Sequence, residues 1–413
     1  MKLVLSHPTG NANVRAAAIG FLEAGILDCF YTAIATFPGN IFDLVSSIGP
    51  FSDFNRRRFD PLLKDYTRKY PWLELGRHFA SGVGLKNLLK HEKGIFSIDA
   101  VYKNLDRHVA ADLEKKAKRG INTVYAYEDA GVYSFRKAKS LGLQCYYDLP
   151  IGYWRSARKL LEPEKGKWPE WIPTLTSFED SEEKLLRKDQ EIKLADKIFV
   201  ASQFTANTLK DFEGILPPIE VISYGFPPVT INREYSAISG RPLKLLFVGG
   251  LSQRKGIANL FEAVETFGKH VELTVVGAKP NINCIPLEAA LRKHRWIPSL
   301  SNKEVITLMK GNDVLVFPSL FEGFGLVINE AMSQGTPVIT TDRTAGPDFI
   351  KHKENGWLIE ASSTDALRRA IEELLINPEK ISIVGRNAME TASIRPWTVY
   401  GKELAEAVIN NRN

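Results

Sequence analysis

The stretch of sequence that decides the fold is Phe317-Pro318-Ser319-Leu320-Phe321-Glu322-Gly323-Phe324-Gly325-Leu326-Val327-Ile328-Asn329-Glu330-Ala331-Met332. Residues 313–317 are an apolar run that predicts a buried parallel strand. Gly323 and Gly325 then predict a loop with unusual backbone angles. Residues 326–334 predict a helix, which Gly335 ends. The stretch therefore predicts a strand, a glycine loop and a helix in direct succession.

The start of this predicted helix is suited to binding an anion. The backbone N–H groups of Phe324, Gly325 and Leu326 lie where the helix macrodipole favours negative charge, so a phosphate fits there. Glu322 and Glu330 would repel a phosphate unless they face neutral hydroxyls. A nucleotide-sugar meets both conditions, because its phosphates lie between two hydroxyl-rich groups. The alternative is that Glu322 is a loop charge and Glu330 a solvated helix residue.

Several motifs of the chain resemble those of one known family. The two glutamates and the glycine loop resemble the Glu-x7-Glu signature of retaining GT-B glycosyltransferases, especially family 4, whose bacterial members build polysaccharides, glycolipids and O-antigens. The run Leu245-Leu246-Phe247-Val248-Gly249-Gly250-Leu251-Ser252-Gln253-Arg254-Lys255-Gly256 resembles the donor-phosphate loop of that family. Residues 195–204 resemble the last strand of its first domain, and residues 221–225 resemble the segment that leads into its linker. The motifs stand in the family's order and spacing.

The resemblance implies an α/β fold with two Rossmann-like, doubly wound domains that face a central cleft, the GT-B fold. A chain of 413 residues is too long for one ordinary core and suits two domains. We expect an N-terminal acceptor domain at 1–225, a linker at 226–243, a donor-binding domain at 244–395, and a crossover helix at 396–413 that returns to the first domain.

Strands and helices alternate in both halves of the chain. Strands are predicted at 3–5, 28–35, 124–127, 143–148, 245–248, 271–276, 296–297, 314–317, 338–341 and 357–359. Helices are predicted at 14–27, 42–45, 80–90, 112–119, 257–267, 326–334, 364–375, 381–392 and 397–409. Such alternation predicts parallel sheets, which bind ligands beyond the carboxyl ends of their strands. Glu128, Asp129 and Asp148 are predicted at that edge.

The resemblance also implies roles for single residues. Arg254 and Lys255 would stabilise the charge that grows on the departing diphosphate, in place of a metal. Glu322 would lie at the donor sugar and Glu330 at the ribose hydroxyls. The other predicted donor contacts are Gly10, Gly250, Ile297, Gly323, Phe324, Gly325 and Leu326. The alternative for the two cations is that they are exposed charges in a turn before a helix.

Two departures from the family pattern bear on these roles. Many members have arginine directly after the first glycine of the phosphate loop, where this chain has Gly250, so Arg254 is expected to supply that charge. Many also have histidine at the end of a first-domain strand near the reacting carbon. Here the candidates are Glu128, Asp129 and Asp148, of which Glu128 is our choice as the catalytic group. The alternative is that these residues are helix caps or turn carboxylates.

Composition narrows the class of protein. With 44% hydrophobic and 25% charged residues, the chain is that of a globular protein. No apolar run approaches the roughly 20 residues that span a bilayer, and the first residues are too few for a signal-peptide core, so we expect a cytoplasmic protein. Three cysteines and seven histidines show no disulfide or metal-ligand pattern. We therefore expect no metal and no cofactor.

Positive charge is concentrated near the N-terminus. The first 160 residues hold 24 Lys and Arg against 15 Asp and Glu. A basic and aromatic cluster there comprises Phe51, Phe54, Arg56, Arg57, Arg58, Phe59, Tyr66, Arg68, Lys69, Tyr70 and Trp72. It predicts peripheral contact with the anionic inner membrane or binding of an acidic acceptor, and the alternative is a solvated face. Nucleic-acid binding is not supported, because no recognised fold signature accompanies the cluster.

These observations together predict an enzyme. We expect a retaining glycosyltransferase that moves a sugar from a nucleotide-diphosphate sugar to a glycan or lipid-linked acceptor in bacterial polysaccharide, O-antigen or glycolipid synthesis. The alternatives are a nucleotide-sugar epimerase and a non-catalytic sugar-nucleotide binding protein. A hydride-transfer enzyme is disfavoured, because the loops after Leu5 and Val248 lack Gly-x-Gly-x-x-Gly.

Overall fold

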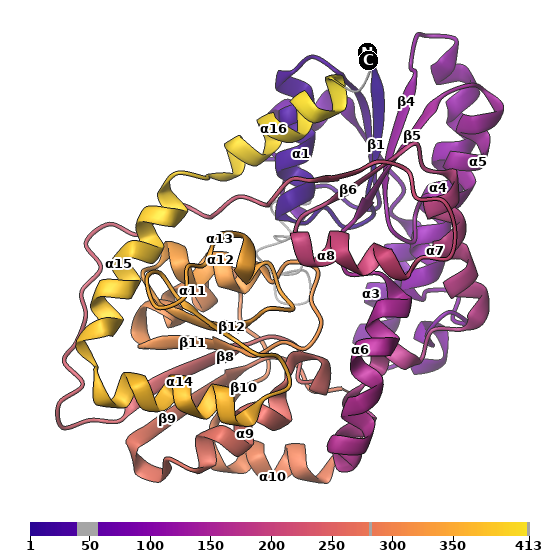
Figure 1. Cartoon of the computed structure of the whole chain (residues 1–413). Helices are drawn as coiled ribbons and strands as arrows, with labels where there is room; N and C mark the ends of the chain where they lie inside the picture. The colour runs from indigo at the N-terminus through magenta and orange to yellow at the C-terminus, as the bar shows by residue number, and fades with distance from the viewer. Residues whose placement is uncertain (39–56, 281–282, 411–413) are drawn as a thin grey trace.

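The computed structural model describes residues 1–38, 57–280 and 283–410. The predicted helix at 42–45 and the cluster residues Phe51, Phe54 and Arg56 lie outside the described residues. Two parallel sheets dominate the structure, one above the other in Figure 1, and the helices pack around them. The predicted α/β class with two doubly wound sheets is confirmed. The exact domain boundaries stay a prediction.

The first sheet has seven strands, and every pairing between them is parallel. Its spatial order is β3-β2-β1-β4-β5-β6-β7, so the chain reverses direction across the sheet between β1 and β4. Ligands bind at such a reversal, in the crevice beyond the strand ends. The strands are β1 (Leu3–Ser6), β2 (Leu27–Thr32), β3 (Thr67–Lys69), β4 (Thr123–Tyr127), β5 (Gln144–Leu149), β6 (Lys197–Val200) and β7 (Ile219–Val221).

The described helices of the first half cover both faces of the first sheet, apart from the one at Trp154–Lys167, which runs beside the second sheet. They are α1 (Ala12–Glu23), α3 (Trp72–Gly82), α4 (Ile98–Ala117), α5 (Val132–Ser140), α6 (Trp154–Lys167), α7 (Glu182–Leu194) and α8 (Gln203–Thr208). The helix predicted at 80–90 is wrong: α3 ends at Gly82, and only a short 3-10 turn at Lys86–Leu89 follows. Helix α4 is much longer than the predicted 112–119, because Ser97 caps its N-terminus by accepting a hydrogen bond from the Ala100 N–H at 3.1 Å.

The second sheet has six strands, again all parallel. Its order is β10-β9-β8-β11-β12-β13, with the reversal between β8 and β11. The strands are β8 (Leu243–Val248), β9 (Val271–Val276), β10 (Arg295–Ile297), β11 (Val314–Phe317), β12 (Val338–Thr341) and β13 (Trp357–Ile359). All six were predicted, within two residues at each end.

Five of the eight helices described in the second half were predicted. They are α9 (Ile257–Glu265), α10 (Ile285–Lys293), α11 (Asn302–Gly311), α12 (Leu326–Ser333), α13 (Gly346–Phe349), α14 (Thr364–Ile376), α15 (Glu379–Ser393) and α16 (Trp397–Ile409). Ser301 and Glu304 form a capping box that fixes the start of α11. Helices α10, α11 and α13 were not predicted from the sequence.

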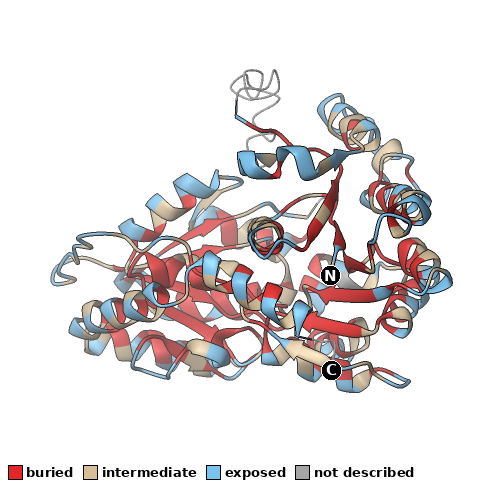
Figure 2. Ribbon diagram, turned by 90° about the horizontal axis from the view of Figure 1, so that it is seen from above, coloured by how far each residue is buried: buried red, intermediate tan, exposed pale blue. Residues whose placement is uncertain are grey.

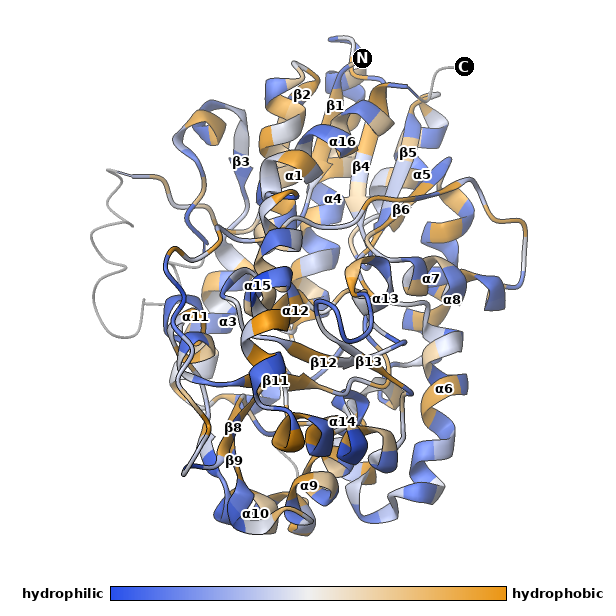
Figure 3. Cartoon of the chain, turned by 60° about the vertical axis from the view of Figure 1, so that its left-hand side comes forward, coloured by the Kyte–Doolittle hydropathy of each residue, from blue (hydrophilic) through white to orange (hydrophobic). Residues whose placement is uncertain are grey.

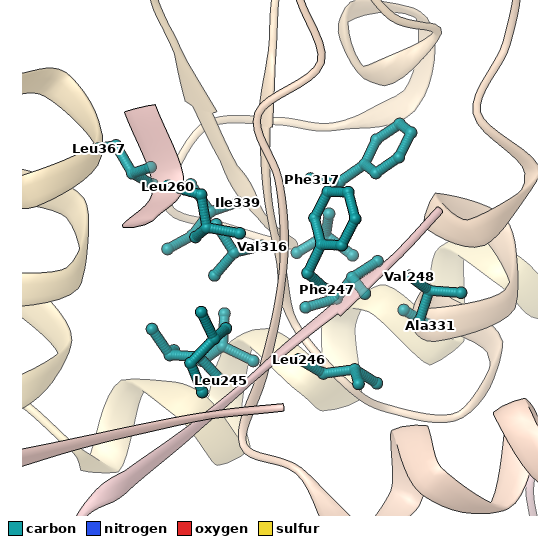
Figure 4. Close-up of a cluster of buried hydrophobic side chains, with 14 of the residues drawn as sticks. Leu245, Leu246, Phe247, Val248, Leu260, Val316, Phe317, Ala331, Ile339 and Leu367 are labelled. Atoms are coloured by element: carbon teal, nitrogen blue, oxygen red, sulfur yellow. The ribbon is translucent and has the colours of Figure 1, made fainter. Parts of the chain in front are cut away.

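The central strands of both sheets are buried, as Figure 2 shows in red. The continuous apolar run of β8 lies between helix layers, which is why its residues do not alternate with polar ones. Figure 4 shows Leu245, Phe247, Val316 and Phe317 among the side chains of this core. Strands β11 and β12 are correspondingly coloured as hydrophobic in Figure 3. A rigid core of this kind holds the loops at the strand ends in fixed positions.

The C-terminal helix returns to the first sheet, as predicted. Helix α16 lies along α1 in Figure 1, and the two helices contact each other along their length. The close approach requires glycine, because a Cβ on Gly20 would lie 2.2 Å from the Gly401 carbonyl oxygen. The chain therefore crosses between the two sheets once at residues 222–242 and again before α16.

Candidate functional site

A cavity of about 430 Å³ lies where the reversal points of the two sheets face each other. The ends of β1, β4, β8 and β11 all contribute to its wall. Its lining residues include His7, Asn11, Asp99, Tyr102, Tyr127, Glu128, Asp129, Lys184, Gly249, Gly250, Lys255, Glu322, Phe324, Gly325, Leu326 and Val327. The carboxyl ends of the parallel strands and the glycine loop, both predicted to bind ligand, thus lie at the same cavity.

The glycine loop brings the start of helix α12 to the cavity. Gly325 has a φ of 90°, a left-handed conformation that favours glycine, and it is the N-cap residue of α12. Phe324, which also lines the cavity, packs against Tyr224 with ring centroids 4.8 Å apart. The positive end of the α12 dipole is therefore directed at the cavity, where it favours an anion.

The same loop is held by the first half of the chain. The carbonyl oxygen of Gly323 accepts hydrogen bonds from the Ser202 hydroxyl at 2.6 Å and the Thr205 hydroxyl at 2.8 Å. Both hydroxyls are buried. A Cβ on Gly323 would lie 1.9 Å from the Pro150 carbonyl oxygen, so only glycine fits. Apart from their place after a strand, no sequence pattern marked Ser202 and Thr205 as contacts of this loop.

Lys255 and Glu322 form an ion pair at the cavity wall. The Lys255 ammonium also lies 4.9 Å from the centre of the Phe317 ring. Burial lowers the pKa of Lys255, and the neighbouring Arg254 charge acts in the same direction, whereas contact with the Glu322 carboxylate favours the charged ammonium. A phosphate at the start of α12 would favour the ammonium further.

Arg254, which was expected to contact the diphosphate, contacts the loop that carries Glu322 instead. Its guanidinium donates a hydrogen bond to the Phe321 carbonyl oxygen at 2.8 Å and lies 3.6 Å from the Glu322 carboxylate. Burial lowers the pKa of Arg254 to about 10. The described residues that line the cavity include Lys255 but not Arg254. The geometry thus makes Arg254 a brace for the loop that carries Glu322.

His7 is one of the cavity residues that sequence reasoning missed. Its Nδ1 accepts hydrogen bonds from the backbone N–H groups of Thr9 at 3.0 Å and Gly10 at 2.9 Å. Burial, and then the Arg57 charge, lower the pKa of His7 to about 3, so the ring is neutral at physiological pH. Because Nδ1 is an acceptor, the proton of the neutral ring is on Nε2. The available signal was a histidine directly after the first strand.

Glu128 and Asp129 line the opposite wall within a network of cations. The Lys188 ammonium lies 3.2 Å from Glu128, and Arg187 lies 2.8 Å from Asp129. Burial raises the pKa of Glu128, while Lys188 opposes this shift. Burial also raises the pKa of Asp129, but Lys188, Lys184 and Arg187 outweigh it and the net shift is downward. Asp129 is thus the carboxylate that stays charged most readily.

Glu330 lies in a second cavity of about 820 Å³, adjacent to the first. Leu326 lines both cavities and so marks their boundary. The Glu330 carboxylate accepts a hydrogen bond from the Asn302 amide at 2.7 Å. Burial raises the pKa of Glu330 to about 7. The two glutamates of the motif therefore face two neighbouring spaces, as two hydroxyl-rich ends of one ligand require.

Only some of the other residues predicted at the site line a cavity. Gly250 lines the first cavity, but the described lining residues of both cavities include neither Gly10 nor Ile297. Gly10 is backed by the Phe59 ring, and its neighbour Asn11 faces the cavity instead. Asp148 is buried beside the cavity wall and accepts a hydrogen bond from the Tyr125 hydroxyl at 2.7 Å. Burial raises the pKa of Asp148 to about 7.

Among the described residues, one group has ligand atoms close enough together for a metal ion: His91, Glu92 and Asp180. Its oxygen and nitrogen atoms already have partners. The Lys184 ammonium lies 2.9 Å from Asp180, and the Glu92 carboxylate accepts a hydrogen bond from the Ser181 N–H at 2.9 Å. A bound cation would have to displace Lys184, so the group is explained as an ion-pair network.

Comparison with known proteins gives a family for the second half of the chain. Residues 228–391 match the family model described as glycosyl transferases group 1. An uncharacterized glycosyltransferase of Methanocaldococcus jannaschii is 28% identical over 204 residues, which are 49% of this chain and 56% of that protein. The capsular polysaccharide biosynthesis glycosyltransferase CapM of Staphylococcus aureus is 28% identical over 169 residues, 38% of this chain and 43% of CapM. The chain thus aligns with about half the length of these curated relatives.

Solved structures match over the whole length. Sucrose-phosphate synthase from Thermosynechococcus elongatus has a TM-score of 0.67 at 17% identity and covers 99% of this chain and 98% of its own. HepE of Anabaena, solved in complex with UDP and glucose, has a TM-score of 0.64 at 17% identity, with coverage of 99% and 100%. These likenesses show a shared fold. Residues 228–391 thus belong to the group 1 glycosyltransferase family, and the chain as a whole has the two facing Rossmann-like sheets of the GT-B fold.

Proposed function

We propose that the protein is a retaining glycosyltransferase that takes a sugar from a nucleotide-diphosphate sugar. The main support for this proposal is that the Lys255 ammonium and the start of α12 lie at the same cavity between the two sheets. A diphosphate placed there would contact a cation and a helix dipole together. HepE was solved with UDP and glucose, which supports UDP as the nucleotide part of the donor.

The two adjacent cavities define the orientation in which the donor would bind. With the diphosphate at Lys255, the nucleoside extends past Leu326 into the second cavity, where Glu330 accepts hydrogen bonds from the ribose hydroxyls. The sugar then occupies the first cavity between Glu322 and the first sheet. His7 faces it with an Nε2–H donor, and Glu128 and Asp129 face it with carboxylates.

The transfer step breaks the bond between the anomeric carbon and the diphosphate oxygen. The electron pair goes to the departing oxygen, and Lys255 with the α12 dipole stabilises the negative charge that grows there. The acceptor hydroxyl attacks the anomeric carbon from the face that the diphosphate leaves. Its proton goes to a departing phosphate oxygen, which yields a glycoside with retained configuration and a nucleoside diphosphate.

A donor screen followed by product analysis tests this function. UDP-, GDP- and ADP-sugars are compared for thermal stabilisation, which reaches about 2.7 kcal/mol at a hundredfold excess over the dissociation constant. The selected donor is then incubated with glycan and lipid-linked acceptors. Acceptor-dependent release of nucleoside diphosphate with a new glycoside is expected. Epimerised donor without release would instead show an epimerase, and stabilisation without any turnover would show a binding protein.

Glu330 should make donor binding depend on pH. Its pKa of about 7 lies above the ordinary value, so the ionised form is disfavoured by burial and predominates only above neutrality. Ribose hydroxyls donate to the ionised carboxylate, and binding of the nucleoside is therefore expected to weaken as pH falls from 8 to 6. The other charged side chains lining this cavity are Arg15, Lys303 and Glu304.

The measurement is titration calorimetry with the nucleoside of the selected donor at several pH values. Glu330→Gln should bind more weakly than wild type at pH 8 and lose the pH dependence in this interval. A wild-type affinity that is constant between pH 6 and 8 would contradict the assignment of Glu330 to the ribose.

We also propose that the N-terminal half rests on an anionic lipid surface and takes a lipid-linked acceptor from it. Helix α3 has its polar side chains inward, where Glu74 pairs with Arg57 at 2.7 Å and Arg77 at 2.9 Å. Its outer face is apolar: Trp72 is 80% exposed and Phe79 67%. This arrangement is the reverse of that on an ordinary solvated helix.

The residues around α3 also favour contact with an anionic lipid surface. Exposed lysines occur on either side of it in the sequence: Lys64, Lys69, Lys86, Lys90 and Lys93. Phe96 packs against Gly76 in the middle of α3. Ile98, two residues further along the chain, is exposed and lines the first cavity. Exposed apolar side chains thus occur both on α3 and at the cavity wall. No helix in the part of the chain that the structure describes is long and apolar enough to cross a bilayer.

Removing the apolar anchors should release the protein from vesicles. Burying one such side chain contributes about 1.5–3 kcal/mol, so Trp72→Ser with Phe79→Ser should lower binding to phosphatidylglycerol vesicles by at least about tenfold. Ile215→Ser, which alters a side chain that is 95% exposed elsewhere in the same half, is the matched control. Cosedimentation of the double variant equal to wild type would contradict the proposal.

A further inference from the structure

One segment of the first half of the chain packs into the second half. We call residues 154–174, which comprise α6 and the 3-10 turn Pro169–Thr174, the arm. The arm connects β5 with β6 of the first sheet, yet Figure 1 shows α6 running down beside the second sheet. Trp171 belongs to the core of the second half, where its ring stacks on Phe261 at 6.0 Å. Cys284 donates a hydrogen bond to the Glu170 carbonyl oxygen at 3.5 Å.

The arm contacts the turn that carries Lys255. Gln253 is fully buried at the start of that turn, Gln253–Lys255. Its backbone N–H donates to the Thr174 hydroxyl at 2.9 Å, and its side-chain amide donates to the Glu164 carboxylate at 2.8 Å. Both Glu164 and Thr174 are buried, so these bonds are sheltered from water.

The remaining contacts of Gln253 stay within the second half. Its amide also donates to Asn259 at 3.0 Å, and its amide oxygen accepts from the Ala258 N–H at 2.9 Å. The other Glu164 oxygen accepts a hydrogen bond from the Ser362 hydroxyl. The arm thus supplies the acceptors that fix one end of the turn, two residues before the proposed phosphate cation.

We propose that Glu164 and Thr174 are positioning residues for Lys255, so that the donor-phosphate site is completed by a segment from the first half of the sequence. This inference rests on the proposed role of Lys255. A displacement of about 1 Å in a catalytic group is enough to cost about a hundredfold in rate, so the hydrogen bonds that fix the turn matter for function. The arm acts through the turn and does not touch the donor.

Substitution of Thr174 gives the sharpest test, because one variant removes the hydroxyl and the other keeps it. Thr174→Val removes the acceptor of the Gln253 N–H and keeps the shape, whereas Thr174→Ser keeps the acceptor. Binding is measured for the nucleoside diphosphate that the donor screen selects and for its nucleoside, which lacks phosphates. Thr174→Val should weaken diphosphate binding about tenfold and leave nucleoside binding unchanged, and Thr174→Ser should bind both as wild type does.

Three further variants make every outcome informative. Glu164→Ala should show the same selective loss, while Glu162→Ala, at an exposed position on the same helix, should bind both ligands as wild type does. Equal weakening of both ligands by Thr174→Val would show a merely structural role and overturn the inference, as would no weakening of either. If Lys255→Met itself leaves diphosphate affinity unchanged, the proposed role of Lys255 fails and the inference fails with it.

Discussion

Replacing Lys255 with methionine is expected to lower kcat/KM by about 100- to 1000-fold, the loss of about 2.7–4 kcal/mol that follows removal of one charge-stabilising donor. Methionine keeps the length and apolar stem of the side chain but removes the ammonium that lies at the cavity wall beside Glu322. The nucleoside contacts in the second cavity remain, so nucleoside binding should persist. Release of nucleoside diphosphate at varied donor concentration measures the effect.

Loss of stability must be separated from loss of catalysis in this variant. Removing the ammonium leaves the Glu322 carboxylate buried, with the Arg254 guanidinium 3.6 Å away. Removing one partner of a buried ion pair destabilises a protein by about 3–5 kcal/mol. The double variant Lys255→Met with Glu322→Gln removes both charges, so its melting temperature should recover while turnover stays low. Full turnover in either variant would show that Lys255 has no role in the transfer.

Gly323→Ala is the second change with a large expected effect. The added Cβ would lie 1.9 Å from the Pro150 carbonyl oxygen and 2.6 Å from the Ile151 Cα, so the glycine loop must move away from the first half. That movement breaks the hydrogen bonds from Ser202 and Thr205 to the Gly323 carbonyl oxygen. Leaving buried polar groups unpaired costs about 1–3 kcal/mol each. We expect a lower melting temperature and a kcat/KM reduced by about 100-fold or more.

The control for this variant is another glycine to alanine change. Gly311 has open space around its Cβ position and lies at the end of α11, so Gly311→Ala should leave both melting temperature and turnover near wild type. Gly323→Ala with unchanged turnover would mean that the loop does not need its contact with the first half for catalysis.

The second half of the chain was predicted well because its signals are local. The run Leu245–Val248 in β8 is apolar over four residues, and α16 follows Pro396, so strand and helix could be recognised without tertiary information. The glycine loop was recognised for the same reason: Gly325 does adopt a left-handed conformation before α12. Glu322 and Lys255 were each expected at the donor site, at the sugar and at the diphosphate, and the structure brings them together as an ion pair.

What the sequence did not reveal depends on contacts between distant segments. The orientation of Arg254 is set by a carbonyl of the loop at Phe321, 67 positions away in the chain. His7 becomes a cavity residue only because β1 lies at the reversal point of its sheet. The arm has three prolines, Pro163, Pro169 and Pro173, which obscured its helical pattern. Its apolar Trp171 packs in a core that lies outside its own half.

The central claim is that Lys255 and the start of α12 bind the diphosphate of an activated sugar. A crystal structure of the protein with the nucleotide-sugar selected by the donor screen tests it most directly. We expect phosphate oxygens within hydrogen-bond distance of the Lys255 ammonium and of the backbone N–H groups that begin α12, with the nucleoside beside Glu330. A diphosphate bound away from both groups, at saturating ligand, would contradict the claim.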